Sequence, residues 1–213
     1  MKTDDLVAML AAGAAPVEPR ATARRYGAAL GWGAFGSTLL MALLLGVRPD
    51  LTEAARLPMF WLKLVFPLGI AGAALLAAMR LSRPGVGLGA VPGGLAALVL
   101  VIWLLALGEY IDAAPSERGD LVYGQSWLVC PAYIVMLSIP VLAAALWAMR
   151  GLAPTRPVLA GAAAGLLAGS FGAAVYALYC DEMGAPFLAI WYVLGMLLSA
   201  GCGAAAGRAV LRW

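Results

Sequence analysis

The sequence contains no histidine and few charged residues, and both shortages exclude large classes of function. Without an imidazole there can be no histidine-ligated metal, no Ser-His-Asp triad and no histidine proton relay. Only 12% of the residues are charged, about half the share that is usual in soluble domains. In contrast, 64% are apolar and the mean hydropathy is +0.93. This composition predicts a membrane protein.

Six apolar runs of about 20 residues are each long enough to cross a bilayer. They cover residues 26–47, 57–79, 86–108, 127–149, 158–179 and 186–207. Lys63 is the single charge well inside a run, and we expect its stem to snorkel to the headgroups. We therefore predict an all-α polytopic membrane protein. Residues 1–25 would form a cytoplasmic segment and tether, and residues 26–213 a six-helix transmembrane domain.

The distribution of charge predicts that both termini lie in the cytoplasm. With this orientation, ten of the 14 basic residues face inward: Lys2, Arg20, Arg24, Arg25, Arg80, Arg83, Arg150, Arg156, Arg208 and Arg212. Eight of the 11 acids face outward: Asp50, Glu53, Glu109, Asp112, Glu117, Asp120, Asp181 and Glu182. Excess Lys and Arg mark the cytoplasmic loops of membrane proteins, so the basic residues decide the orientation.

Small residues recur at every fourth position in the fifth and sixth spans. These stripes are Gly161, Gly165 and Gly169 in the fifth span, and Gly195, Ser199, Gly203 and Gly207 in the sixth. Because such a spacing lets two helix backbones approach closely, we expect the two spans to pack together, although the stripes could instead form a homodimer interface. In the fourth span, Pro131 and Pro140 can each kink the helix.

The central turns of the spans carry no ionisable group of the kind that marks a transport path. No pair of aspartates, Ser-Lys dyad or HExxH helix indicates an enzyme, and we expect no catalytic activity. A small transporter or channel for an apolar or metal solute remains the alternative class of function.

Three cysteines are present, and two of them fall near the outer ends of adjacent spans. Cys130 lies in the fourth span and Cys180 ends the fifth, whereas Cys202 is expected to be a small buried residue of the sixth. The outer pair could be a structural disulfide, two unrelated apolar residues, or a reactive pair that responds to an oxidant or a soft metal. In the last case Asp181 and Glu182 could supply oxygen ligands beside the sulfurs.

The N-terminal segment predicts a short amphipathic helix followed by a tether. Leu6, Val7, Met9 and Leu10 form its apolar face, and Asp4 and Asp5 suit the helix N-terminus. The helix should end at Gly13, before Pro16 and Pro19. The acids argue against a cleaved signal peptide and make an anionic membrane surface a poor partner. A groove on a partner protein is therefore favoured over the membrane surface.

Several stretches of the chain together resemble the NrsF family. They are MKTDDLVAMLA at the N-terminus, SWLVCPAYIVMLSIP in the fourth span, and LAPTRPVLAGAAAGLLAGSFGAAVYALYCDE followed by WYVLG. Members of this family are six-span inner-membrane anti-sigma factors of proteobacteria, which inhibit ECF sigma factors of the sigma-F type.

The resemblance implies a transcription regulator without enzymatic activity or resident cofactor. It implies that the cytoplasmic N-terminal segment binds the sigma factor, without direct contact to nucleic acid, and releases it under heavy-metal or oxidative stress. It also implies that the family's two signal-responsive cysteines are Cys130 and Cys180, as transient metal ligands or redox groups. That Leu6, Val7, Met9 and Leu10 make the contact is inferred from their periodicity. Homo-oligomerisation stays open.

Overall fold

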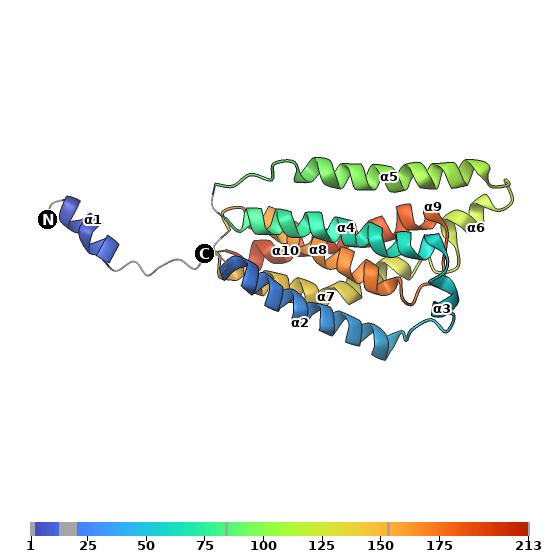
Figure 1. Ribbon diagram of the computed structural model, residues 1–213, viewed down its shortest axis with the longest axis horizontal. Coiled ribbons are helices and arrows are strands. Elements are labelled where there is room, and N and C mark those ends of the chain that lie inside the picture. Colours follow the sequence, from blue (N-terminus) through green and yellow to red (C-terminus); the bar gives the residue numbers. More distant parts are fainter. Residues whose placement is uncertain (1–2, 13–20, 84, 153, 213) are drawn as a thin grey trace.

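The computed structural model describes residues 3–12, 21–83, 85–152 and 154–212, without the side chains of Leu10, Ala21 and Thr22. Every regular element in these residues is helical, as expected (Figure 1). The helices are α1 (Thr3–Ala12), α2 (Ala21–Leu44), α3 (Leu51–Ala54), α4 (Pro58–Leu81), α5 (Val91–Asp112), α6 (Arg118–Tyr123), α7 (Cys130–Arg150), α8 (Pro157–Tyr176), α9 (Ala185–Phe187), the π-helix η1 (Leu188–Tyr192) and α10 (Val193–Val210).

Six of these helical segments are long and apolar enough to cross a membrane, which agrees with the predicted number of spans. They are α2, α4, α5, α7, α8 and the continuous segment Ala185–Val210, in which η1 joins α9 to α10. At ~1.5 Å of rise per residue, each covers about the 30 Å of a hydrocarbon core.

Prolines in the first turn set where several helices begin. A proline at this position loses no helical hydrogen bond and already has a helical φ angle. Pro131 occupies such a position in α7, so the predicted kink at Pro131 is wrong, whereas Pro140 lies inside the same helix. Pro92 likewise lies in the first turn of α5. This helix covers Val91–Asp112, so the third span lies several residues later in the chain than the predicted run 86–108.

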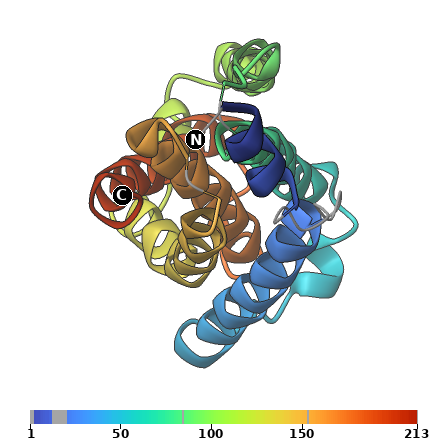
Figure 2. The same cartoon turned by 90° about the vertical axis from the view of Figure 1, so that its left-hand side faces the viewer.

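Helix α8 lies at the centre of the bundle and packs against α10, α7 and α4 (Figure 2). The predicted contact between the small-residue stripes of the fifth and sixth spans is confirmed. A Cβ atom added at Gly203 of α10 would lie only 2.6 Å from the Cα atom of Gly165 in α8, closer than real Cβ contacts allow. The two backbones therefore touch directly along this seam.

Helices α2 and α5 lie at the periphery of the bundle (Figure 2). Helix α2 packs on α7, where the Ser37 hydroxyl donates a 2.7 Å hydrogen bond to the carbonyl of Leu137. Helix α5 contacts α4 and α9. Its Glu109 carboxylate accepts a 2.7 Å hydrogen bond from the Ala185 amide at the start of α9, where a helix N-terminus favours negative charge.

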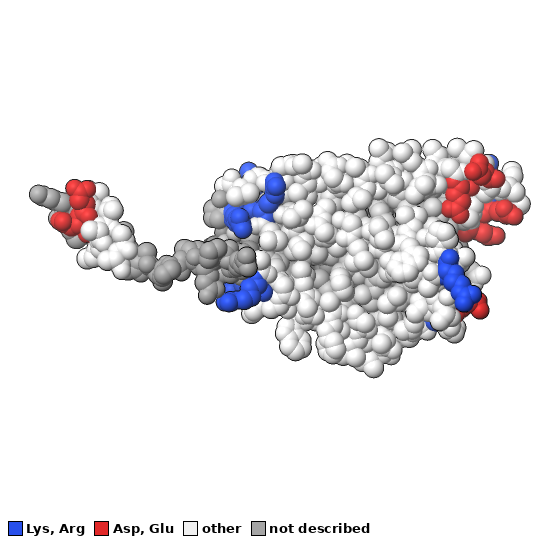
Figure 3. All heavy atoms as spheres, in the orientation of Figure 1, with Lys and Arg blue, Asp and Glu red and all other residues white. Residues whose placement is uncertain are grey.

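Charged residues gather at the two ends of the bundle, and the acids of the bundle are concentrated at one of them, beside a smaller patch of Lys or Arg (Figure 3). Lys and Arg gather at the end where α2 begins and α10 finishes, and Asp and Glu gather mainly at the other end, which we call the outer end (Figure 3). This separation is the one on which the orientation was predicted. The side of the membrane that each end faces stays a prediction.

Candidate functional site

Cys180 lies just beyond the C-terminus of α8, at the outer end. The helix ends at Tyr176, and a turn follows in which the Cys180 amide donates to the Tyr176 carbonyl over 2.9 Å. The side chain of Cys180 is buried, with 2% of the residue exposed. Cys130 is the first residue of α7 and is fully buried. The sequence thus placed both cysteines correctly at the ends of their spans.

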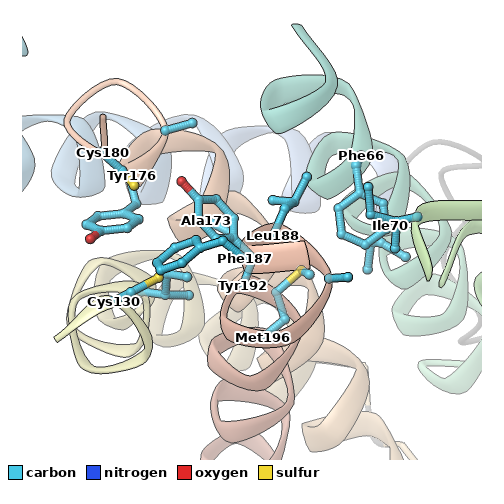
Figure 4. Packing of buried hydrophobic residues seen from close by; sticks show 14 of the residues in the cluster. Phe66, Ile70, Cys130, Ala173, Tyr176, Cys180, Phe187, Leu188, Tyr192 and Met196 are labelled. Carbon is cyan, nitrogen blue, oxygen red and sulfur yellow. The ribbon is translucent and has the colours of Figure 1, made fainter. Parts of the chain in front are cut away.

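Both thiols belong to one buried cluster with the aromatic residues of α8 and η1 (Figure 4). The cysteines are free, so the reading of a standing disulfide is wrong for this structure. The rings of Tyr176 and Tyr192 lie 5.7 Å apart between their centroids. Their buried hydroxyls find no hydrogen-bond partner among the described residues.

The π-helix η1 was not predicted from sequence. Each hydrogen bond of a π-helix spans one residue more than in an α-helix. The segment η1 ends at Tyr192, which lies in the cluster of the thiols. No glycine or proline lies within its five residues, so the sequence offers no local signal for it.

Lys63 of α4 is also buried at this site, with 1% of the residue exposed. Its ammonium group donates to the carbonyl oxygen of Cys180 over 2.8 Å and to that of Glu182 over 2.6 Å. It also lies 5.8 Å from the centroid of the Tyr192 ring. The expectation that Lys63 snorkels to the headgroups is wrong, because the turn after α8 supplies carbonyl acceptors inside the protein.

Arg48 is a second donor to the carbonyl of Cys180. It lies between α2 and α3, and its guanidinium donates to the Cys180 carbonyl over 3.0 Å. The remaining N–H groups bind the Asp50 carboxylate at two points, over 2.7 and 2.6 Å. The hydrogen bonds from Arg48 lower the pKa of Asp50, and the carboxylate in turn raises the pKa of Arg48.

The two acids that follow Cys180 have different surroundings. The Glu182 carboxylate accepts hydrogen bonds from the backbone amides of Gln125 and Ser126, over 2.6 and 3.2 Å. It therefore joins the turn after α8 to the segment that leads into α7. Asp181 is exposed. The role of both acids as accessory ligands stays a prediction.

An open pocket of about 480 Å³ reaches Cys180 at the outer end. Its walls come from three parts of the chain: the segment after α2, the approach to α7, and the end of α8. They include Arg48, Asp50, Ser126, Tyr179 and Asp181. A small solute that enters this pocket would come within reach of the buried residue.

No group of three or more His, Cys, Asp or Glu residues that could hold a metal occurs among the described residues. A resident metal coordinated by protein alone needs about four ligands. Whether Cys130 and Cys180 bind a transient soft ion or react with an oxidant stays a prediction.

The predicted binding residues of the N-terminal helix lie on α1. Leu6, Val7 and Met9 are exposed, with 39%, 59% and 66% of each residue accessible. The side chain of Leu10 and the predicted tether with Gly13, Pro16 and Pro19 lie outside the described residues. Whether these residues bind a partner stays a prediction.

Sequence reasoning misjudged the burial of Cys202 and missed the contact that Arg48 makes with Cys180. Cys202 is exposed on α10, so the expectation that it is buried is wrong: its helix position points away from the seam with α8. Arg48 was missed by sequence reasoning, since nothing in its spacing from Cys180 indicates a contact across 132 positions.

Comparison with known proteins gives consistent matches. The profile of the NrsF family, described as negative regulator of sigma F, matches residues 10–213. A protein of Azospira oryzae named probable anti-sigma-F factor NrsF is 54% identical over 213 residues, and one of Caulobacter vibrioides named anti-sigma-F factor NrsF is 43% identical over 221. Both alignments cover 100% of each chain. No solved structure matches this chain.

Proposed function

The chain belongs to the NrsF family of negative regulators of sigma F, and from this membership we propose that it is a membrane anti-sigma factor. It resides in the bacterial inner membrane, has no enzymatic activity and holds an ECF sigma factor of the sigma-F type in an inactive state. The full-length identity of 54% to a relative named as a probable anti-sigma-F factor carries this proposal.

The sigma factor binds through the cytoplasmic N-terminal segment. The exposure of Leu6, Val7 and Met9 on α1 supports this. The helix has only 10 residues. An isolated helix of this length is marginal in water, so it gains stability when its apolar face lies in a partner's groove. The family profile begins only at residue 10, but both relatives align along the whole segment.

The first experiment is a pull-down of a purified ECF sigma factor of the sigma-F type from the same organism with membranes carrying the full-length protein. We expect binding that is lost when residues 2–14 are deleted. The variant Leu6→Asp with Met9→Asp should weaken binding at least ~10-fold, because both residues are large apolar anchors. Ala8→Asp adds one negative charge on the opposite side of α1 and should bind like the unchanged protein. If the full-length protein binds no such sigma factor, the proposal is wrong.

Release of the sigma factor follows chemistry at Cys130 and Cys180. Two observations support this: both thiols lie in one cluster at the outer end, and an open pocket reaches Cys180. With a peroxide, the two thiols would give up two protons and two electrons and form one disulfide, while the peroxide is reduced to two molecules of water. A soft metal ion would instead displace the two protons and join the two thiolates.

Either bond changes how the end of α8 packs against the start of α7. Shifting the sigma factor from nearly all bound to nearly all released requires ~5.5 kcal/mol of differential interaction. A disulfide or a thiolate–metal bond contributes free energy of that order. Only the part of this free energy that differs between the sigma-bound and the released arrangement drives the release.

A further inference from the structure

We propose that Lys63 and Arg48 form a clamp on the Cys180 carbonyl, and that opening this clamp carries the signal from the thiols to α4 and α2. The inference rests on the proposed function, because it concerns how a change at Cys180 reaches the sigma-binding segment. It assigns a positioning role to two cations that the sequence alone did not connect with the cysteines.

One backbone oxygen accepts hydrogen bonds from both cations. The Cys180 carbonyl lies 2.8 Å from the Lys63 ammonium and 3.0 Å from the Arg48 guanidinium. The Arg48 amide also donates to the Leu178 carbonyl over 3.1 Å, in the same turn. Carbonyls beyond a helix C-terminus lack helical partners and carry partial negative charge, so cations are favoured at this place. Residue 180 thus cannot move far without breaking a charged hydrogen bond.

The burial of Lys63 makes the clamp a two-state device. Both of its hydrogen bonds end on carbonyl oxygens, in a position with 1% exposure. If the turn moves away, the ammonium is left buried without these acceptors, which is costly, so α4 must shift or rotate to provide others. In an intermediate position of the turn, the Lys63 ammonium would have neither the present carbonyl acceptors nor the new ones. Packed elements of this kind move between discrete arrangements.

The clamp joins the thiols to the elements that lead to the sigma-binding segment. Arg48 follows α2 by only a few residues, and the other end of α2 begins at Ala21, next to the predicted tether. Helix α2 packs along α7, whose first residue is Cys130. A change at Cys180 therefore reaches α2 through the clamp at Arg48. A change at Cys130 reaches α2 through the packing of α7 against it.

The variant Lys63→Met tests the clamp, because methionine keeps a long unbranched stem but lacks the ammonium group. We expect membranes with this variant to retain at least ~10-fold less sigma factor without any stress, since two charged hydrogen bonds that favour the resting arrangement are lost. Its melting temperature in detergent should fall only slightly, because losing the desolvation cost of the buried ammonium offsets part of the two lost hydrogen bonds. Arg56→Met, which removes an exposed cation at the same end, is the control and should retain the sigma factor.

Two further variants separate signalling from simple structural damage. Lys63→Arg keeps a positive charge and its donors, and should restore retention. Lys63→Met combined with Cys130→Ser and Cys180→Ser should still release the sigma factor, because the clamp acts after the thiols. Normal retention by Lys63→Met would overturn the inference, and so would release accompanied by a large fall in melting temperature without rescue by Lys63→Arg. If the unchanged protein binds no sigma factor at all, the proposed function fails instead.

Discussion

Cys130 and Cys180 are the residues on which the proposed response depends, and their removal gives the most direct test of it. The double variant Cys130→Ser with Cys180→Ser should bind the sigma factor like the unchanged protein, because serine is similar in size to cysteine. It should retain the sigma factor when peroxide or a cadmium salt is added, since no disulfide or thiolate–metal bond can form. The measurement is the sigma factor that remains on the membranes after treatment.

Cys202→Ser is the matched control for this experiment. It removes the exposed cysteine in the second half of α10, a helix that finishes at the end opposite the outer end, and should leave the response unchanged. A normal response in the double variant would show that the two outer thiols are not the sensor. A lost response in the control would show that Cys202 also takes part in the response.

Asp50 gives a prediction for pH at the same end of the molecule. Because Arg48 lowers the pKa of Asp50 in the folded state, the ionised carboxylate stabilises the fold above the ordinary value of 3.8, and this contribution is lost as the pH falls through the lower folded-state pKa. Asp50→Asn should therefore lower the melting temperature slightly at pH 6, and the difference should shrink as the pH falls below 3.8. The effect is small because Asp50 is exposed to solvent. A difference that grows with acidity would contradict this assignment.

At the scale of the elements, the seam between α8 and α10 is the most sensitive contact to a change of size. Gly203→Leu should destabilise the protein by ~3 kcal/mol or more, because the new side chain would meet the backbone of α8 at Gly165. Gly201→Leu is the matched control, since a Cβ atom there would find no heavy atom within 4 Å. Thermal unfolding in detergent measures both. Equal stability of the two variants would show that the seam does not form.

The sequence predicted those elements whose signals are local. The apolar runs predicted the six spans, because a helix surrounded by lipid needs apolar side chains. The glycines spaced by four predicted the seam, because only small residues let two helix backbones touch. The start of α5 was misplaced because residues 86–90 were counted with the apolar run. The glycines there, of which Gly89 has a φ of 58°, and Pro92 in the first turn of α5 mark a turn before the helix.

The contacts around Cys180 could not be predicted in the same way. Lys63 and Cys180 are 117 positions apart, and an isolated lysine near the end of a span reads as one that snorkels to the headgroups. Only the fold shows that the turn after α8 lies beside Lys63 and offers it the carbonyl oxygens of Cys180 and Glu182. The sequence thus identified the two thiols but missed the cations that hold one of them in place.

For the whole molecule, the separation of charge in Figure 3 makes a prediction about topology. The end with most basic residues should face the cytoplasm and the end with the cysteine site should face outward. Without this orientation, the proposed sensor and the sigma-binding segment would lie on the wrong sides of the membrane. The orientation is therefore a condition for the whole proposed mechanism.

Two single-cysteine variants test this orientation in a protein whose three native cysteines are replaced by serine. Ser116→Cys lies in the exposed loop between α5 and α6, and Thr155→Cys in the exposed loop between α7 and α8. A thiol reagent that cannot cross the membrane should label Ser116→Cys in intact spheroplasts, and should label Thr155→Cys only after the cells are opened. The reverse pattern would place α1 outside, where no sigma factor is present, and would exclude the anti-sigma mechanism. The predicted pattern would place a solute-accessible pocket and a cytoplasmic binding helix on opposite sides of one bundle, which is the arrangement a transmembrane sensor requires.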